Sequence, residues 1–182
     1  MLVFFSSYGY MELLLEDLKK TKSPLRKRMY VAPKGIQAAR FAKVIKTLEL
    51  RPHKQFIVTV LGSSLGEGIE FPEGMLDGIM VVGPGFPTID FENSLLQSYH
   101  ENGGEDGFNL SVLYPAVSKV VQAVGRLIRR ETDRGFILLI GDQYATEYYR
   151  YLPRYLYEQI HDVFPGVEWK GILKKFLAHG MT

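Results

Sequence analysis

The chain has 182 residues, a formal net charge of +2, 46% hydrophobic residues and 23% charged residues. This balance is typical of one folded globular domain and excludes a disordered chain. The absence of cysteine excludes disulfides and thiol nucleophiles, and the four scattered histidines give no metal-ligand spacing, so no metal site is expected. No apolar run has the roughly 18 residues of a membrane span. Ser6–Gly9 interrupt the apolar opening, so we expect no signal peptide and a protein that is not secreted.

Short apolar runs alternate with stretches of helical periodicity. In chain order the sequence predicts a strand at 2–5, helix at 11–18, strand at 29–32, helix at 38–48, strands at 56–61 and 79–82, a flexible polar insert at 102–107, helix at 115–130, strand at 136–140 and a short terminal helix. The runs are continuous rather than alternating, which is typical of parallel strands covered on both faces. The expected fold is therefore a three-layer α/β/α domain with a mainly parallel central sheet.

In such sheets ligands bind beyond the carboxyl ends of the strands. Residues 6–8, 62–70 and 83–87 directly follow three of the predicted strands, so we expect them at that edge. A domain seldom begins with a strand in its first residues. The run at 2–5 therefore suggests a fragment of a larger protein.

The predicted helix at 115–130 carries a polar set with helical spacing. Gln122, Arg126 and Arg129 are four and three residues apart and would share one face. A pair of guanidinium groups held on a helix suits a multiply charged anion such as a triphosphate. On spacing alone a solvated polar face is the simpler interpretation, but it does not explain Gly125. Gly125 would lie inside the helix, where it costs about 1 kcal/mol relative to alanine.

The loop after the third strand is rich in glycine. Gly62, Gly66 and Gly68 would let the backbone approach a ligand, and Glu67 and Glu70 offer carboxylates to hydroxyl or guanidinium groups. A tight turn that leaves a strand is the structural alternative. No Gly-Lys-Ser/Thr triplet occurs in the chain, so the loop is not a Walker A loop.

Three segments together resemble a known family. They are Leu2-Val3-Phe4-Phe5-Ser6-Ser7-Tyr8, Gly62-Ser63-Ser64-Leu65-Gly66-Glu67-Gly68-Ile69-Glu70-Phe71 and Gln122-Ala123-Val124-Gly125-Arg126-Leu127-Ile128-Arg129. In this order they resemble motifs IV, V and VI of the XPD/DinG group of superfamily-two DNA helicases. The Asp133-Arg134-Gly135 turn fits the same family, and the resemblance extends from residue 2 to about 178.

The resemblance implies that residues 1–182 are the second RecA-like motor domain of an ATP-dependent DNA helicase. In that family ATP lies between two such domains, and the second contributes arginine fingers. By the match these are Arg126 and Arg129, with Gln122 as a phosphate or water sensor. Gly68, Glu70 and Gly125 would border the nucleotide, with Glu70 near the ribose.

By the same match, motif IV and V residues would lie along single-stranded DNA: Ser6, Ser7, Tyr8, Ser63 and Ser64. The partners implied are this strand and a first motor domain of the same polypeptide. ATP with Mg²⁺ is the implied cofactor, and an iron–sulfur cluster is possible only in the missing first domain. This chain alone, without Walker A and B residues, should not hydrolyse ATP. The implied location is the cytoplasm of a prokaryote or the nucleus of a eukaryote.

Two residues depart from the family pattern. Glu70 stands where aspartate is usual, and Gln143 stands where arginine often follows the strand-end Asp142. These departures keep a second hypothesis open, a non-catalytic helicase-like module that binds nucleic acid or a partner protein. An unrelated nucleotide-binding enzyme such as a kinase or synthetase is a third, and the missing glycine–lysine loop argues against it.

Two further features have more than one interpretation. The basic run from Lys19 to Arg28 could contact DNA phosphates or form a solvated face. The aromatic series near the end could stack on bases or pack against the sheet; it comprises Tyr144, Tyr148, Tyr149, Tyr151, Tyr155, Tyr157 and Trp169.

Overall fold

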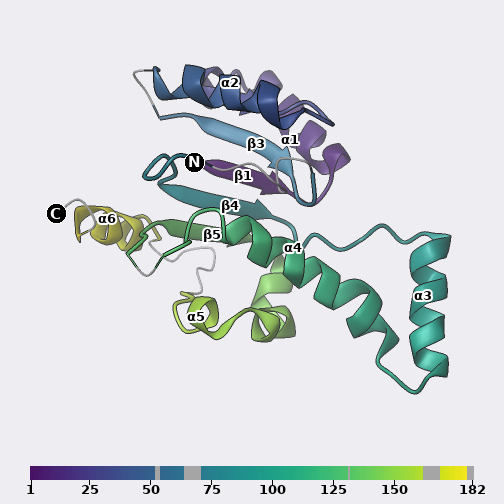
Figure 1. Ribbon diagram of the computed structural model, residues 1–182. Helices are drawn as coiled ribbons and strands as arrows, with labels where there is room; N and C mark the ends of the chain where they lie inside the picture. Colours follow the sequence, from purple (N-terminus) through teal and green to yellow (C-terminus); the bar gives the residue numbers. More distant parts are fainter. Residues whose placement is uncertain (52–53, 64–70, 131, 162–168, 180–182) are drawn as a thin grey trace.

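The computed structural model describes residues 1–51, 54–63, 71–130, 132–161 and 169–179 (Figure 1). One parallel sheet has the strand order β2-β3-β1-β4-β5, with β1 at its centre. The strands are β1 (Leu2–Phe5), β2 (Met29–Val31), β3 (Phe56–Val60), β4 (Gly78–Val82) and β5 (Phe136–Ile140). Phe5 at the end of β1 is in register with Val60 of β3 and Val82 of β4. The predicted strands are therefore confirmed, each to within one residue at its ends.

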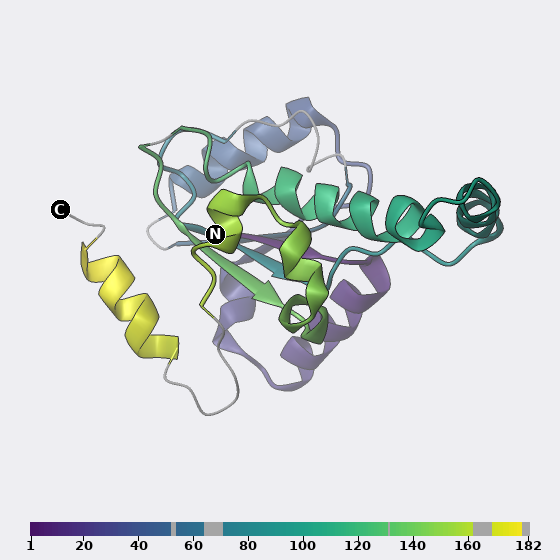
Figure 2. The ribbon, with the colours of Figure 1, turned by 90° about the horizontal axis from the view of Figure 1, so that it is seen from below.

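Alternate residues of the central strand face two different hydrophobic layers. Leu2 and Phe4 belong to the larger core, which also contains buried residues of α2 (Ala38–Glu49) and α4 (Tyr114–Val124). Val3 and Phe5 belong to a smaller core that includes Met11 of α1 (Tyr8–Lys20). Helices thus cover both faces, as the continuous apolar runs predicted (Figures 1 and 2).

Local signals set the ends of the first two helices. Ser7 caps α1, because its hydroxyl accepts a hydrogen bond from the Tyr10 amide at 3.2 Å. Thr21 follows α1, and the basic run then continues through the short 3₁₀ helix η1 (Pro24–Arg28), where no residue is buried. In α2 the buried residues Phe41, Ile45 and Leu48 recur at helical spacing.

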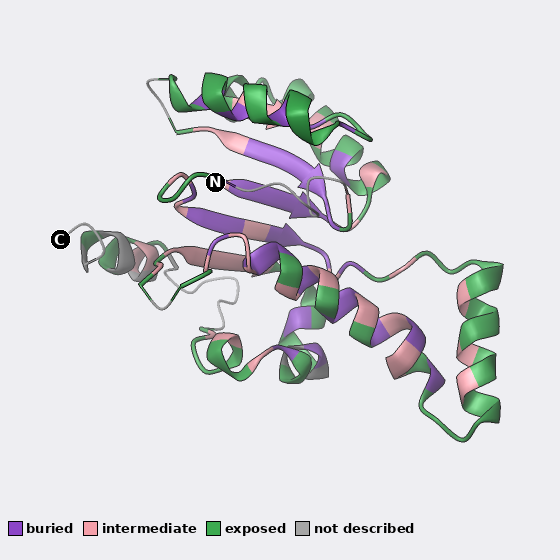
Figure 3. Cartoon of the chain, in the orientation of Figure 1, coloured by how far each residue is buried: buried purple, intermediate pink, exposed green. Residues whose placement is uncertain are grey.

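A helical hairpin projects from the sheet between β4 and β5. It consists of α3 (Phe91–Asn102), a turn, and the π-helical segment η2 (Asn109–Leu113) that continues into α4. Figure 3 shows α3 mostly exposed, with some positions of intermediate burial, and no residue of α3 is buried. The sequence predicts a polar insert at 102–107 but no helix at 91–102. An apolar stripe is the main signal for a helix, and α3 has none directed into a core.

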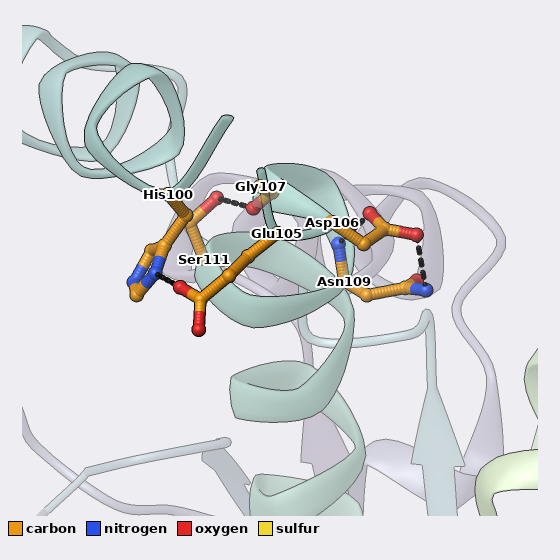
Figure 4. A network of polar contacts seen from close by, with 6 residues as sticks. All are labelled: His100, Glu105, Asp106, Gly107, Asn109 and Ser111. Atoms are coloured by element: carbon orange, nitrogen blue, oxygen red, sulfur yellow. Dashed lines mark hydrogen bonds and ion pairs between the residues drawn. The ribbon is translucent and has the colours of Figure 1, made fainter. Parts of the chain in front are cut away.

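Polar contacts close the turn of this hairpin (Figure 4). His100 Nδ1 lies 2.6 Å from Glu105 Oε2, and Asp106 accepts a hydrogen bond from the Asn109 amide at 2.9 Å. The Ser111 hydroxyl is buried and donates to the Gly107 carbonyl at 2.6 Å. The insert therefore forms a defined turn that joins α3 to the start of the next helix.

The C-terminal part begins with three short helices, η3 (Asp142–Ala145), η4 (Glu147–Tyr151) and α5 (Arg154–Tyr157). Tyr144 and Tyr148 are buried against the larger core, so two members of the aromatic series pack against the domain. Helix α6 (Trp169–His179) confirms the predicted terminal helix (Figure 2). Within the described residues, no helix has the length and apolar character needed to cross a bilayer.

Candidate nucleotide and nucleic-acid sites

The segment with the two candidate arginine fingers is a turn, not part of a helix. Helix α4 ends at Val124, and Gly125 is its C-cap, with φ −60° and ψ −7°. The Leu127 amide donates to the Val124 carbonyl at 2.9 Å, and the chain then turns toward β5. The predicted helix at 115–130 is therefore wrong beyond Val124. Arg126 and Arg129 do not share a helical face with Gln122, and Gly125 is at a helix end, where glycine is common.

Asp133 holds this turn in shape. Its Oδ2 accepts hydrogen bonds from the amides of Arg129 at 2.8 Å and Arg130 at 2.9 Å. The Asp133 amide donates to the Arg130 carbonyl at 3.1 Å. The two backbone N–H groups hold the pKa of the Asp133 carboxyl below its usual range, because they stabilise the ionised form. The carboxylate thus fixes the backbone that carries the arginines.

An arginine-rich cavity of about 310 Å³ opens beside the turn. It lies between the segment before β4 and the segment before β5, and its lining is Phe71, Pro72, Glu73, Gly74, Leu76, Arg126, Leu127, Arg129, Arg130, Thr132, Asp133 and Arg134. Arg126 is half-buried and Arg129 is exposed. Arg130 Nη1 pairs with Glu73 Oε1 at 3.2 Å, a contact that joins the two segments.

The charges of this cavity favour an anion. Four of its lining residues are arginines and two are carboxylates. Glu73 already pairs with Arg130, and Asp133 accepts two backbone amides. Guanidinium groups bind phosphate oxygens through paired, charge-assisted hydrogen bonds. The arrangement can therefore hold a phosphoryl group near Arg126 and Arg129.

Some candidate residues lie either outside the described residues or outside the lining of the cavity. Ser64, Gly68 and Glu70 belong to residues 64–70, which are outside the described residues. Phe71–Gly74 follow that loop directly and share the cavity with Arg126 and Arg129. Gln122 is exposed on the last turn of α4 and is not a lining residue of the cavity.

The candidate DNA contacts gather at the opposite edge of the sheet. Ser6, Ser7 and Tyr8 follow β1, and Ser63 follows the adjacent β3, so the parallel pairing brings them to the same carboxyl edge. Ser6 is half-buried and its amide donates to the Val82 carbonyl at 3.0 Å. The Ser63 hydroxyl is 3.0 Å from that of Thr59. Residues 6–8, 62–63 and 83–87 all lie at this edge, as the sequence predicted.

Three further side chains also lie there. Lys34 and Lys119 were not indicated by the sequence, whereas Phe86 belongs to the predicted segment 83–87. Lys34 places its Nζ 5.5 Å from the centre of the Tyr8 ring. The side chain of Lys119 in α4 lies next to Gly62: a Cβ added at Gly62 would be 3.6 Å from Lys119 Cε. Phe86, at the end of the Gly83–Phe86 turn, remains 37% exposed. Lys34 and Lys119 are distant in sequence from the strands they approach, so no local pattern indicated them.

The two candidate sites occupy different edges. The arginine cavity lies where β4 and β5 begin, whereas the serines lie where β1 and β3 end. The strand arrows of Figure 1 point from the first edge toward the second. A nucleotide contact and a nucleic-acid contact can therefore be made at the same time by one domain.

Comparisons with known proteins agree with these features. A family model described as a helicase C-terminal domain matches residues 1–159. The chain is 27% identical over 182 residues to the regulator of telomere elongation helicase 1 homolog of Caenorhabditis briggsae, covering 85% of this chain and 18% of that protein. It is 27% identical over 150 residues to the ATP-dependent DNA helicase DinG of Photobacterium profundum, covering 81% and 21%. The chain thus spans about a fifth of the length of these relatives.

Solved structures show the same fold. A structure titled XPD helicase matches with a TM-score of 0.63 and 21% identity, covering 81% of this chain and 25% of that chain. Together with the parallel sheet and its two helical layers, this likeness shows a RecA-like α/β fold. Because the family model covers most of the chain, this chain belongs to the helicase C-terminal domain family, in the XPD/DinG group of superfamily two.

Proposed function

We propose that this chain is the second motor domain of an ATP-dependent DNA helicase. ATP would bind in the cleft between this domain and a first motor domain of the same polypeptide, and its hydrolysis would drive movement along single-stranded DNA. The observation that carries the proposal is the cavity in which Arg126 and Arg129 lie beside the segment that follows residues 64–70.

Arg126 and Arg129 would act as arginine fingers in this complex. Hydrolysis moves negative charge onto the oxygens of the transferred phosphoryl group, and guanidinium groups offset that charge. Gln122 would position the attacking water or a phosphate oxygen. Gly125, Gly68 and Glu70 would border the nucleotide, with Glu70 near the ribose.

The carboxyl edge would bind the DNA strand. The hydroxyl groups of Ser6, Ser7, Ser63 and Ser64 and the side chain of Tyr8 would contact sugars and phosphates, which position a strand without reading its sequence. Lys34 and Lys119 flank these residues and add positive charge near the phosphates.

The first motor domain would supply what this chain lacks. The 182 residues include no Gly-Lys-Ser/Thr triplet and no cysteine. Mg²⁺, the lysine that holds the phosphates and any iron–sulfur cluster would therefore belong to the first domain. The chain alone would hydrolyse no ATP, and the assembled helicase would act where DNA is, in the cytoplasm of a prokaryote or the nucleus of a eukaryote.

Replacing Arg126 in the complete helicase tests the finger role. Arg126→Ala should lower DNA-stimulated kcat by a factor on the order of 10³, because an arginine finger acts mainly in the transition state. The affinity for a non-hydrolysable ATP analogue should change only a few-fold. ATP turnover and analogue binding are measured on the same preparations.

Arg154→Ala is the matched control. Arg154 is an exposed arginine of α5 that pairs with Glu158 at 2.6 Å, away from the cavity. Its removal should leave turnover unchanged. Unchanged turnover in Arg126→Ala with a large loss of analogue affinity would refute the finger role. Absence of ATP hydrolysis by the complete wild-type protein would favour the non-catalytic module instead.

A further inference from the structure

The turn that follows β4 is fixed by the hydroxyl groups of two buried tyrosines. Tyr144 Oη donates to the Gly83 carbonyl at 2.9 Å, and Tyr148 Oη donates to the Pro84 carbonyl at 2.9 Å. Burial raises the pKa of both tyrosines, so both hydroxyls remain protonated donors at neutral pH. Two successive carbonyls of the turn thus each accept a hydrogen bond from a tyrosine hydroxyl.

The same turn packs closely against the residues that directly follow β1 and β3. A Cβ added at Gly83 would lie 2.7 Å from Ser6 Oγ, and one at Gly85 would lie 2.8 Å from Leu61 Cδ1. Both glycines have positive φ, +85° and +73°. The turn therefore lies directly beside Ser6, among the residues to which the DNA strand is assigned above.

Phe86 is the side chain that this fixed turn presents. Its ring is 37% exposed and its centre lies 5.9 Å from that of Tyr148, with the ring planes at 59°. Tyr148 is in turn packed edge-on against Tyr144 at 5.1 Å. An aromatic ring that is supported on one side and open on the other is the arrangement with which proteins stack unpaired bases.

We infer that Phe86 is a stacking platform for a base of single-stranded DNA. This inference rests on the proposed function, and it adds the chemical group that the carboxyl edge recognises: the flat face of an unpaired base, next to the sugar and phosphate contacts of Ser6 and Ser63. Every base has such a face, so the platform accepts any sequence. Tyr144 and Tyr148 are positioning residues that hold the turn.

A comparison of normal and abasic DNA isolates the base contact. Fluorescence anisotropy at low salt would measure binding of the 182-residue chain to a labelled 15-nucleotide thymidine strand and to an abasic strand of equal length. Both strands carry the same phosphates, so their affinity ratio reports on bases alone. The wild-type chain should prefer the thymidine strand by roughly 5- to 150-fold.

Three substitutions at position 86 test the ring. Phe86→Ala and Phe86→Leu should both lose the preference for the thymidine strand while binding the abasic strand as the wild type does. Leucine retains most of the apolar volume of the ring, so the leucine variant separates loss of the ring from loss of the fold. Phe86→Trp should retain the preference, and thymidine but not abasic DNA should quench its added fluorescence. Phe91→Ala, which removes an exposed ring on α3, is the matched control and should change neither affinity.

The outcomes separate this inference from the proposed function. If Phe86→Ala and Phe86→Leu keep the wild-type preference, or if they weaken both strands equally, the stacking platform is wrong and the DNA-binding edge stands. If the wild-type chain binds neither strand, the DNA-binding edge itself is wrong and the platform with it.

Discussion

Two glycines of the candidate sites differ in the sign of their backbone φ angle and in the space available for a side chain. Gly83 has a φ of +85°, and an added Cβ would meet Ser6 Oγ at 2.7 Å. Gly125 has a φ of −60°, and an added Cβ would meet its nearest atom, the Val121 carbonyl oxygen, at an ordinary 3.4 Å. A side chain is therefore excluded at position 83 and tolerated at position 125.

Alanine at each position should show this difference. Gly83→Ala should lower the free energy of unfolding by more than about 1 kcal/mol, because alanine is strained at positive φ and must displace Ser6. Gly125→Ala should change it by between about 0 and +1 kcal/mol, because alanine restricts the unfolded chain. Urea denaturation followed by circular dichroism measures both; equal losses would show that the turn after β4 is not constrained as described.

The charge of Asp133 gives a pH-dependent prediction. Its lowered pKa means that the ionised carboxylate stabilises the fold above the unfolded value, and that this contribution is lost as the pH falls below about 4. Asp133→Asn should therefore unfold at a lower temperature than the wild type at pH 7, with the difference shrinking near pH 3. Asp142→Asn, which removes an exposed carboxylate beyond β5, is the matched control variant. An equal difference in unfolding temperature between wild type and Asp133→Asn at both pH values would contradict the role of the carboxylate.

Among individual residues, the sequence indicated candidate site residues but not the residues that support them. Arg126 and Arg129 were selected as candidates because they belong to a recognisable motif. Glu73 and Asp133 were not assigned their roles, because one acts across 57 positions of sequence and the other through backbone amides. Contacts of that kind exist only after folding.

Among the secondary-structure elements, η3 and η4 hold the loop after β4. Tyr144 lies in η3 and Tyr148 in η4. Each donates its hydroxyl hydrogen bond to a carbonyl of the turn after β4, more than 60 residues earlier in the chain. These two short helices therefore have a role in the carboxyl edge although their own sequence has no apolar stripe.

Removing one hydroxyl should weaken this connection. Tyr144→Phe should lower the free energy of unfolding by about 1–3 kcal/mol, because the Gly83 carbonyl would lose its buried donor. Burial raises the pKa of Tyr144, so the stability it provides is present below about pH 10 and is lost as the pH rises above that value. The wild type should therefore lose stability above pH 10 more steeply than Tyr144→Phe.

Thermal unfolding between pH 7 and pH 11 checks this prediction. Tyr155→Phe, at a 51% exposed ring, is the matched control and should lie within about 0.5 kcal/mol of the wild type at neutral pH. A Tyr144→Phe protein as stable as this control would mean that the hydroxyl does not anchor the turn.

The elements themselves were predictable where burial leaves a pattern in sequence. Continuous apolar runs located all five strands of the sheet. Helix α3 was missed because none of its residues is buried. The end of α4 was placed too late because Ile128, which packs against the larger core, continues the helical spacing four residues after Val124, where the helix has already ended. Periodicity reports which residues are buried, not where the backbone stops being helical.

For the whole molecule, the main feature is the separation of the two candidate sites. The arginine cavity lies where β4 and β5 begin, and the serines and Phe86 lie where β1, β3 and β4 end. Ser63 lies at the second edge, and Phe71, eight positions later in the sequence, lines the cavity at the first.

In the function proposed above, this chain completes an ATP site which it cannot form alone. The most direct test mixes it with the separately purified first motor domain of its parent protein and single-stranded DNA, and measures ATP turnover. We predict no turnover by either domain alone, DNA-stimulated turnover by the wild-type mixture, and a mixture containing Arg126→Ala that stays near the background. Turnover by this chain alone, or full turnover with Arg126→Ala, would contradict the account.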